Sequence, residues 1–350
     1  MAIPATHRQW LTSQNGIENL TLTLTVLPFP GPSEVLVKIS AISINYRDTE
    51  VIMGLYNHHS TTGGPLPTLV PCSDICGTIV QSNSPNWNVG DRVLSTFNQT
   101  HLSGQIKAEN MKSGLGLPLP GVLAEYKVFP DYGLVKAPAY LSAEEASTLP
   151  IAGMTAWMAI NGMRPIGSPG GMGEVFLIQG TGGVAINGLQ IAKAIIITSS
   201  SDAKLQQAKI HGADKTINYK TTPNWDVEVL KMTNGEGVDV IFENGGAATL
   251  RKSFECITFG GLINCIGYLS GKEDAVEDRT NTNVLALKRN VTLKGLLNGP
   301  RDRFEEMLRF YEEKEIKPVI DKVFSFDESK EALKYLFSGA HFGKVVIKVE

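Results

Sequence analysis

The stretch that most constrains the fold is 175–202, "VFLIQGTGGVAINGLQIAKAIIITSSSD". It opens with an apolar run at 175–178 that predicts a buried strand, and a glycine cluster at 180–183 follows. A helical pattern then leads to a second, β-branched run at 195–198. A strand, a glycine turn, a helix and a second strand in this order predict the first βαβ unit of a parallel sheet.

The glycine cluster has the form G-x-G-x-x-A, and it follows a strand and opens a helix. Its first glycine permits a tight turn, and its second lets backbone N–H groups approach a pyrophosphate. The small Ala185 lets the helix lie close to the strand, and the helix N-terminus favours the phosphate charge. The pattern predicts a dinucleotide site that includes Gly180, Thr181, Gly182, Gly183 and Val184.

The end of the second strand indicates which dinucleotide is bound. A site for NAD needs Asp or Glu about 20 residues after the first glycine, to bond the ribose 2′-hydroxyl. This chain has Thr-Ser-Ser-Ser at 198–201, where Ser199 and Ser200 suit a 2′-phosphate and Lys204 could pair with it. We therefore predict NADP(H). Two alternatives remain open: Ser201 or Asp202 caps the next helix, or Asp202 binds the ribose.

The helix meets the second strand without a turn. Connections of this type usually take about two to six residues, often with glycine at the helix end, and 189–201 contains no glycine. About 11 helical residues span roughly 16 Å, barely enough to run back along a strand of about 20 Å. Either the helix unwinds early and uses Lys193 and Ala194 as its loop, or the chain is locally short. We expect strain at this junction.

Strands and helices alternate from residue 151 onward, which predicts an α/β, doubly wound parallel sheet at 151–293. Expected strands are 175–180, 194–199, 215–219, 238–246, 261–268 and 291–296, and expected helices are 184–194, 202–211, 225–233 and 247–258. Residues 1–150 instead contain short β-like runs, at 20–29, 34–45, 76–81, 90–97 and 123–130. These runs predict a β-rich, partly barrel-like domain onto which the tail at 294–350 folds back. Ser142 and Glu145 form a capping box, and 98–120 is expected to be a surface loop.

Composition excludes several classes of function. With a formal net charge of −3, the chain gives no electrostatic reason to expect nucleic acid or an anionic membrane as a partner. No apolar run approaches the roughly 20 residues that span a bilayer, and the first residues lack a secretory signal pattern. Four cysteines in 350 residues do not make a disulfide framework. We expect a cytoplasmic protein whose partner is a small molecule.

Several motifs together resemble the medium-chain dehydrogenase/reductase superfamily, and within it the zinc-free, quinone-oxidoreductase-like branch. The motifs are "SINYRDTEVIMGLY", "VGDRV", "LAEYKV", "LSAEEASTLPIAGMTAW", "IQGTGGVAINGLQIAKA", "GADKTINY" and "FGKVVI", which span nearly the whole chain. Against the family pattern the chain is some four residues short after Ala194. The resemblance implies a GroES-like first domain, a Rossmann second domain and a homodimer.

The resemblance also implies roles for individual residues. Ser199, Lys204 and Tyr219 would surround the 2′-phosphate of NADP(H). Asn45 and Thr155 resemble residues beside the nicotinamide. Further cofactor contacts are implied for Asn244, Gly267 and Lys344.

The sequence predicts no functional metal. Zinc alcohol dehydrogenases of the superfamily hold catalytic zinc with Cys and His near positions 45 and 72, where this chain has Asn45 and Cys72. A structural zinc would need four cysteines close together, and 98–120 contains none. His58 and His59 are expected at the surface or the substrate rim, and the four cysteines as small buried hydrophobes.

Tyr56 is the candidate proton donor. It occupies the tyrosine position of the "N…D…GxY" stretch that enoyl-thioester reductases of the superfamily use, whereas in quinone reductases the same ring only closes the pocket. Asn45 is the second candidate catalytic residue, and Asp48 is expected to order this loop by pairing with Arg47 or capping the next segment.

Without a metal Lewis acid, oxidation of an alcohol loses the group that stabilises the alkoxide. Hydride transfer to an already polarised acceptor remains feasible. We predict an NADPH-dependent reductase of a quinone or an α,β-unsaturated carbonyl. The alternatives are an enoyl reductase that serves a biosynthetic pathway, and a non-catalytic NADPH-binding or redox-sensing protein.

Overall fold

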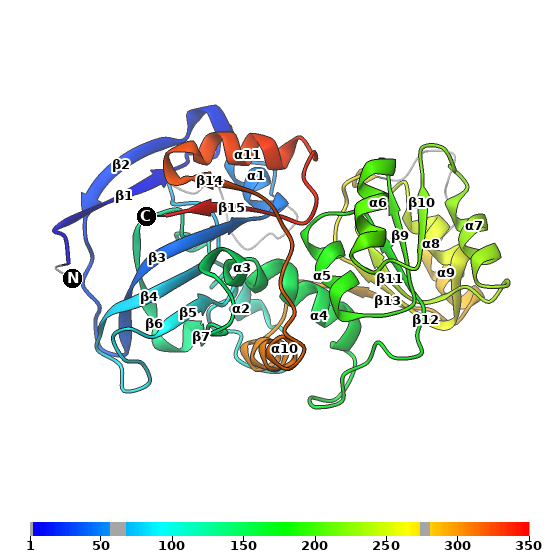
Figure 1. The fold of residues 1–350 in the computed structure, drawn as a ribbon, viewed down its shortest axis with the longest axis horizontal. Helices are drawn as coiled ribbons and strands as arrows, with labels where there is room; N and C mark the ends of the chain where they lie inside the picture. The colour runs from blue at the N-terminus through cyan, green and yellow to red at the C-terminus, as the bar shows by residue number, and fades with distance from the viewer. Residues whose placement is uncertain (1–2, 57–67, 274–280, 350) are drawn as a thin grey trace. The chain divides into compact units, whose positions relative to one another are not determined.

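The computed structural model describes residues 3–56, 68–273 and 281–349. The chain divides into two compact units, Met1–Met154 with Gly299–Glu350, and Thr155–Asn298 (Figure 1). The first and last parts of the chain therefore belong to one unit. The sequence analysis placed the two boundaries a few residues earlier along the chain in each case.

The second unit is built on a six-stranded parallel sheet in the order β10-β9-β8-β11-β12-β13. The first strand along the chain lies inside this sheet, and the order reverses on its two sides, as in doubly wound folds. All four side chains of β8 and all five of β9 are buried, which explains their continuous apolar runs. The strands are β8 (Phe176–Gln179), β9 (Ile195–Ser199), β10 (Lys215–Asn218), β11 (Val238–Glu243), β12 (Ile257–Cys265) and β13 (Thr292–Gly295).

Helices connect these strands, and most agree with the expected ranges to within a few residues. One disagreement concerns the end of α8, which was predicted at residue 258 and lies at Cys256. There β12 already begins at Ile257, and its pairing with β11 jumps from Ile257 to Leu262 around Gly260, whose φ is +77°. The helices are α4 (Met154–Asn161), α5 (Gly183–Ile191), α6 (Asp202–Ile210), α7 (Trp225–Met232), α8 (Leu250–Cys256) and α9 (Thr282–Lys288).

The turnless junction after α5 is resolved by early unwinding. The helix ends at Ile191, and Ala192 already has extended backbone angles, with φ −95° and ψ 175°. Ala194 then adopts φ +56°, in the left-handed region that disfavours residues with a Cβ atom. Of the two alternatives, the structure has the early end of the helix, and the strain is concentrated at Ala194.

The first unit contains a seven-stranded sheet with the path β14-β15-β3-β4-β5-β7, and β6 also pairs with β3. Strands β1 and β2 form a separate hairpin. No strand was predicted from the sequence at the positions of β1, β7 and β14. The strands are β1 (Thr6–Leu11), β2 (Thr21–Val26), β3 (Glu34–Ile44), β4 (Asp74–Ser82), β5 (Arg92–Ser95), β6 (Tyr126–Pro130), β7 (Leu134–Lys136), β14 (Ile320–Ser325) and β15 (Lys344–Lys348).

Five α-helices are described in the first unit: α1 (Tyr46–Ile52), α2 (Ala108–Met111), α3 (Ala143–Ser147), α10 (Arg301–Glu313) and α11 (Ser329–Phe337). The predicted capping box begins α3, because Glu145 N donates to Ser142 Oγ at 3.1 Å and Ser142 N donates to Glu145 Oε2 at 2.8 Å. A π-helix, η3 (Leu149–Gly153), follows α3 and leads into α4. No helix in the described ranges is long and apolar enough to cross a membrane.

Part of the expected surface loop at 98–120 is buried, which corrects the sequence prediction. Leu115 is 1% exposed and belongs to the hydrophobic core of the first unit. Its N–H donates to Phe97 O at 3.1 Å, and Asn98 forms a β-bridge with Gly114. These contacts fold the segment back against the sheet. The few apolar residues of a loop are enough for burial when the backbone is hydrogen-bonded in this way.

Candidate functional site

The glycine cluster forms a turn between β8 and α5. Gly180 has φ +84°, a conformation that a residue with a Cβ atom rarely adopts, and its N–H donates to Thr198 O at 2.9 Å. Gly182 is the N-cap of α5 and has no side chain to accept from the first helical N–H groups. These donors point out of the helix end, where the helix dipole also favours negative charge. The turn therefore fits the phosphates of a dinucleotide.

Close packing of α5 on the sheet depends on Gly188 as well as on Ala185. Ala185 is 2% exposed, as expected for the small residue of the motif. A Cβ atom at Gly188 would lie 2.6 Å from Phe242 Cε2, closer than real Cβ contacts come, and 3.2 Å from Ile178 Cδ1, which is tight. The sequence analysis missed this position, although glycine in the middle of a helix is itself a signal of close approach.

Ser199 and Tyr219 lie together at the carboxyl ends of β9 and β10. Tyr219 N donates to Ser199 O at 3.1 Å, and the Tyr219 side chain is 43% exposed. Next to them, Ser201 caps α6 by accepting from Lys204 N at 3.4 Å. The capping interpretation of Ser201 is therefore correct, and it leaves Ser199 as the last residue of β9 and Ser200 on the connection to α6.

Asp202 and Lys204 both lie in the first turn of α6, at the same edge of the sheet. The carboxylate of Asp202 accepts from Asn218 Nδ2 at 2.8 Å. This bond uses one of its oxygens within the protein. Lys204 is half-buried and follows the hydroxyl-rich connection by one helical turn. The edge therefore carries the half-buried Ser200 hydroxyl and Lys204 ammonium group, together with a carboxylate already bonded to an amide, while Ser199 is 4% exposed.

Asn244 and Gly267 are held at the carboxyl ends of β11 and β12. Asn244 Nδ2 donates to Gln179 O at 2.7 Å, and Gly267 N donates to Glu243 O at 3.2 Å. Glu243 is 1% exposed, and its carboxylate accepts from Gln179 Nε2 at 2.7 Å. Further donors to this carboxylate are Ser253 Oγ, Thr249 Oγ1, Gly245 N and Gly246 N.

Glu243 and Gln179 were missed by the sequence analysis. A polar residue that ends a buried apolar strand is the signal that points to both, because burial requires it to have partners. Thr155, predicted beside the nicotinamide, is 5% exposed and lies in the first turn of α4.

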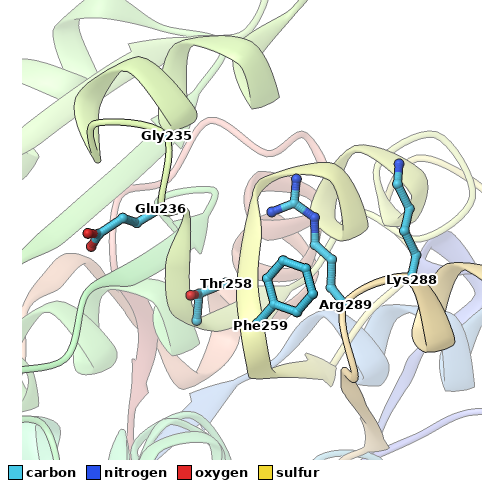
Figure 2. Close-up of a pocket in the computed structure, with 6 residues that line it drawn as sticks. All are labelled: Gly235, Glu236, Thr258, Phe259, Lys288 and Arg289. Atoms are coloured by element: carbon cyan, nitrogen blue, oxygen red, sulfur yellow. The ribbon is translucent and has the colours of Figure 1, made fainter.

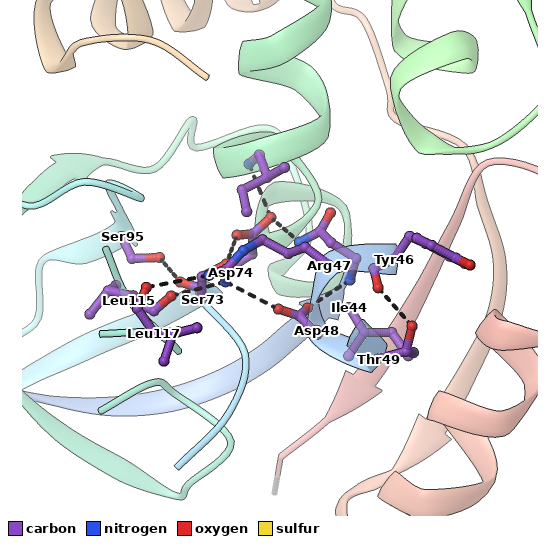
Figure 3. A network of polar contacts seen from close by, with 12 residues as sticks. Ile44, Tyr46, Arg47, Asp48, Thr49, Ser73, Asp74, Ser95, Leu115 and Leu117 are labelled. Atoms are coloured by element: carbon purple, nitrogen blue, oxygen red, sulfur yellow. Dashed lines mark hydrogen bonds and ion pairs between the residues drawn. The ribbon is translucent and has the colours of Figure 1, made fainter. Parts of the chain in front are cut away.

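In the first unit, Asn45 stands between a buried cation and a buried anion. Lys344 Nζ donates to Asn45 Oδ1 at 2.6 Å and to Ile44 O at 2.8 Å. Asn45 Nδ2 donates to Asp74 Oδ2 at 3.0 Å. Asp74 is 0% and Lys344 3% exposed, so these groups interact in a medium that screens charge poorly. Figure 3 shows Asp74 among the polar contacts that surround it.

Charges in this buried cluster balance, with two carboxylates and two cations. Burial raises the pKa of Asp74 and lowers the pKa of Lys344, and the attraction between the two opposes both shifts. Burial also raises the pKa of Asp48 to about 6, although Arg47 Nη1 lies 3.6 Å from Asp48 Oδ1. Desolvation of the Asp48 carboxylate therefore outweighs its ion pair.

Asp48 orders the loop in both of the expected ways. It contacts Arg47, and its Oδ2 accepts from Asn45 N at 2.8 Å, which forms a capping box at the start of α1 (Figure 3). The guanidinium of Arg47 lies 4.8 Å from the centre of the Tyr56 ring and 4.7 Å from that of Phe97. Tyr56 is half-buried, and its ring is therefore held by a cation–π contact.

The donor set around Asn45 does not fit a zinc ion. Zinc takes thiolate, imidazole and carboxylate ligands, but here Asn45 supplies an amide and a buried ammonium stands next to it. Cys72 is buried, and burial raises the pKa of its thiol. Within 3–56, 68–273 and 281–349, no group of three or more His, Cys, Asp or Glu could hold a metal ion. His58 and His59 lie outside the described residues.

Two surface hollows lie at the opposite edge of the second unit's sheet. The larger, of about 450 Å³, is lined by Gly235, Glu236, Thr258, Phe259, Lys288 and Arg289 (Figure 2). A second, of about 380 Å³, includes Ala194 and Asp214. Both lie where the parallel strands begin, whereas ligands of open α/β sheets bind where the strands end. The candidate cofactor residues are at the strand ends, so neither hollow is the candidate site.

Fold and site together define a two-unit protein with a dinucleotide-binding type of sheet. The chain matches the family models of the alcohol dehydrogenase GroES-like domain over residues 31–139 and of zinc-binding dehydrogenases over 180–313. It is 41% identical over 333 residues to a zinc-type alcohol dehydrogenase-like protein of Schizosaccharomyces pombe, covering 91% of this chain and 92% of that one. The chain belongs to the medium-chain dehydrogenase/reductase superfamily. The relatives that it matches are oxidoreductases of this superfamily.

Two further comparisons agree with this family. The chain is 26% identical to the chloroplastic quinone-oxidoreductase QR1 of Triphysaria versicolor, over 91% of this chain and 92% of that one. The crystal structure of a putative alcohol dehydrogenase from Sinorhizobium meliloti 1021 superposes with a TM-score of 0.86 at 34% identity, covering 99% of this chain and 100% of that chain. The predicted fold class and family resemblance are thereby confirmed.

Proposed function

We propose that this protein is an NADPH-dependent, zinc-independent reductase of a quinone or an α,β-unsaturated carbonyl compound. The observation that carries the proposal is the Lys344–Asn45–Asp74 chain, which puts an amide and an ammonium group at a position where zinc members of the superfamily use a ligand. The similarity to a quinone oxidoreductase supports the same class of acceptor.

The cofactor residues support NADPH over NADH. Gly180 and the uncapped N-terminus of α5 provide backbone donors for the pyrophosphate. Ser199, Ser200 and Lys204 are the candidate contacts of a 2′-phosphate, with Tyr219 beside them. Asp202 is the acid that could instead favour NADH, and its bond to Asn218 argues against a primary role on the ribose. Asn244 and Gly267, at the ends of β11 and β12, are further candidate cofactor contacts.

NADPH, when bound, supplies the hydride. The chain's own task is to hold the acceptor, exclude water and stabilise the negative charge that develops on the acceptor oxygen. Asn45 is suited to stabilise that charge, because it carries an N–H donor in a buried setting. Tyr56 is the candidate proton donor for an enone, while a reduced quinone can take protons from water. No metal is needed for either reaction.

The experiment is a screen of NADPH oxidation, with NADH in parallel, across quinones, enals, enones and enoyl thioesters. We expect turnover with at least one quinone or enone, a preference for NADPH, and no loss of activity after treatment with a chelator. A preference for enoyl thioesters would instead identify a tailoring enoyl reductase. Binding of NADPH with no turnover on any acceptor would identify a non-catalytic nucleotide-binding protein. Stoichiometric zinc that follows the activity would overturn the proposal.

A further inference from the structure

The orientation of the Asn45 side-chain amide is unambiguous. The two ends of a side-chain amide differ in chemistry, because the nitrogen donates hydrogen bonds and the oxygen accepts them. The partner at one end is the ammonium of Lys344, which can only donate, and at the other the carboxylate of Asp74, which when ionised can only accept. A flipped amide would place donor against donor and acceptor against acceptor. The oxygen of Asn45 therefore faces Lys344, and its nitrogen faces Asp74.

Asp74 also ties Asn45 to two other segments. Its Oδ1 accepts from Ser73 Oγ at 2.6 Å, and its Oδ2 accepts from Ile151 N at 3.0 Å in addition to Asn45 Nδ2. Ile151 belongs to the π-helix η3, and π-helical turns occur mostly at functional sites. A fully buried carboxylate with three donors cannot rotate without losing several of them, so Asp74 is a rigid acceptor.

One N–H of Asn45 remains for a ligand. The amide nitrogen carries two hydrogens, and Asp74 takes one of them. Among the described residues, no acceptor takes the second. The amide oxygen is already occupied by Lys344, at 2.6 Å. Asn45 is 8% exposed, so the polar function that it offers to a bound molecule is that of a donor.

We propose that Asp74 and Lys344 are positioning residues that lock the Asn45 amide so that it presents an N–H, and never its oxygen, to the oxygen of the acceptor. The identity of that oxygen rests on the function proposed above. As hydride arrives, negative charge grows on the acceptor oxygen, and a preorganised donor stabilises that state more than the ground state. The buried charge of Lys344 behind the amide acts in the same direction.

The sharpest test exchanges the two side chains in the double variant Asn45→Asp/Asp74→Asn. Composition and net charge stay the same. The two hydrogen bonds that link Lys344, Asn45 and Asp74 each keep a counterpart, because the new carboxylate accepts from Lys344 and the new amide donates to that carboxylate. The spare donor at position 45 is lost, and Ile151 N loses the carboxylate oxygen of Asp74 that it shares with Asn45 Nδ2. We expect a drop in kcat of about 10²–10³-fold with enones, the size seen on removal of one such donor. The thermal transition should stay within a few degrees of the parent.

Two single variants complete this comparison. Asp74→Asn keeps the donor at position 45 and a shape-matched acceptor oxygen, so its loss in kcat should be about tenfold smaller than that of the exchange variant. Lys348→Met changes an exposed lysine on the same strand as Lys344 and should leave kcat and KM unchanged. If the exchange variant turns over enones at the parent rate, the hydrogen bonds among Lys344, Asn45 and Asp74 are only structural and the proposal is overturned.

A measurement that needs no turnover separates this proposal from the function itself. Protein labelled with ¹⁵N-asparagine should show one side-chain NH₂ pair that disappears in Asn45→Asp. We expect this pair to exchange slowly with water in the parent, and fast in Lys344→Met and in Lys344→Met/Asp74→Asn. Unchanged exchange in these variants would overturn the positioning roles even in an active enzyme. A parent that reduces no acceptor would end the proposed function, and slow exchange would still support the locked amide.

Discussion

Two groups of candidate site residues, one in each unit, are arranged differently. In the first, Asn45, Asp74 and Lys344 are each less than 10% exposed and bond to one another. In the second, the turn at Gly180 and the connection after Ser199 present backbone donors and hydroxyls at the edge of the sheet, next to the half-exposed Tyr219. The groups of the first arrangement are bonded to one another, whereas those of the second lie at an open edge of the sheet.

This difference has a consequence for function. A buried, mutually bonded cluster fixes the direction of a donor, and direction matters most when charge develops in the transition state. Groups at an open edge add binding energy to the ground state and the transition state alike. Changes in the first unit should therefore act mainly on kcat, and changes at the edge of the second mainly on cofactor affinity.

The largest expected effect belongs to Tyr56. Tyr56→Phe keeps the ring, and with it the cation–π contact to Arg47 at 4.8 Å, and removes only the hydroxyl. If Tyr56 donates the proton, kcat with enones should fall by about 10²–10⁴-fold, while NADPH affinity is preserved. Steady-state rates with enones and quinones, together with an NADPH titration, measure this.

Quinones should be affected much less than enones, because a reduced quinone takes protons from water. Tyr132→Phe, a change at a tyrosine that is 40% exposed in the same unit, serves as the control and should alter neither rate. Enone turnover at the parent rate in Tyr56→Phe would mean that Tyr56 is only a wall of the pocket.

A second prediction tests the electrostatic cost of the buried cluster. Because the pKa of Asp48 is raised from 3.8 to about 6, the folded state binds this proton more tightly than the unfolded state. The resulting stability is present below about pH 4 and is lost as pH rises through about 6. Relative to Asp48→Asn, the parent's free energy of unfolding should fall by on the order of 2–3 kcal/mol from pH 4 to pH 7.

Denaturant unfolding of the parent and of Asp48→Asn at several pH values measures that difference. The asparagine can still accept from Asn45 N, so the capping box at the start of α1 is kept. A difference between the two proteins that does not change with pH would show that the pKa of Asp48 is the same in the folded and unfolded states, so that the charge of Arg47 offsets burial.

At the open edge, Lys204→Ala should act on affinity. Loss of a charge-assisted bond to a 2′-phosphate costs roughly 1.5–3 kcal/mol, which is about tenfold or more in the dissociation constant of NADPH. NADH, which lacks this phosphate, should bind almost as before. Lys209→Ala, at the far end of α6, is the matched control. Equal weakening of both cofactors would contradict the NADPH assignment.

Local patterns predicted what is local in the structure. Strands β8 and β9 are continuous apolar runs because both of their faces are buried, and the glycine turn lies between adjacent elements. Both could be identified from a few neighbouring residues. The capping boxes at Ser142 and at Asn45 are local in the same sense, since each joins residues three apart.

The buried polar cluster could not be predicted in this way. Asp74 lies 29 residues from Asn45 and 77 from Ile151, and Lys344 lies 299 residues from Asn45. A carboxylate at the start of an apolar strand has no defined role until the fold brings its partners together. The sequence identified Asn45 and Lys344 only through a family resemblance, and it missed Asp74 altogether.

The smallest expected effect concerns the residues that flank α5. Gly180 and Ala194 both have positive φ, but only one of them is a glycine. Gly180, before the helix, has φ +84°, and Ala194, after it, has φ +56°. Glycine adopts this conformation without cost, whereas a residue with a Cβ atom pays roughly 1–2 kcal/mol. The alanine is exposed, so its methyl group contributes little packing in exchange.

Ala194→Gly should therefore stabilise the protein. The relief of strain is partly offset by the greater freedom of glycine in the unfolded chain, which costs about 0.4–1 kcal/mol. A net gain of about 0.5–1 kcal/mol is expected, seen as a higher denaturant midpoint with an unchanged slope. Lys193→Gly provides the matched control, because Lys193 is not among the residues with positive φ and glycine there should only destabilise. If both variants lose stability equally, Ala194 is not strained, and the early end of α5 has no energetic cost.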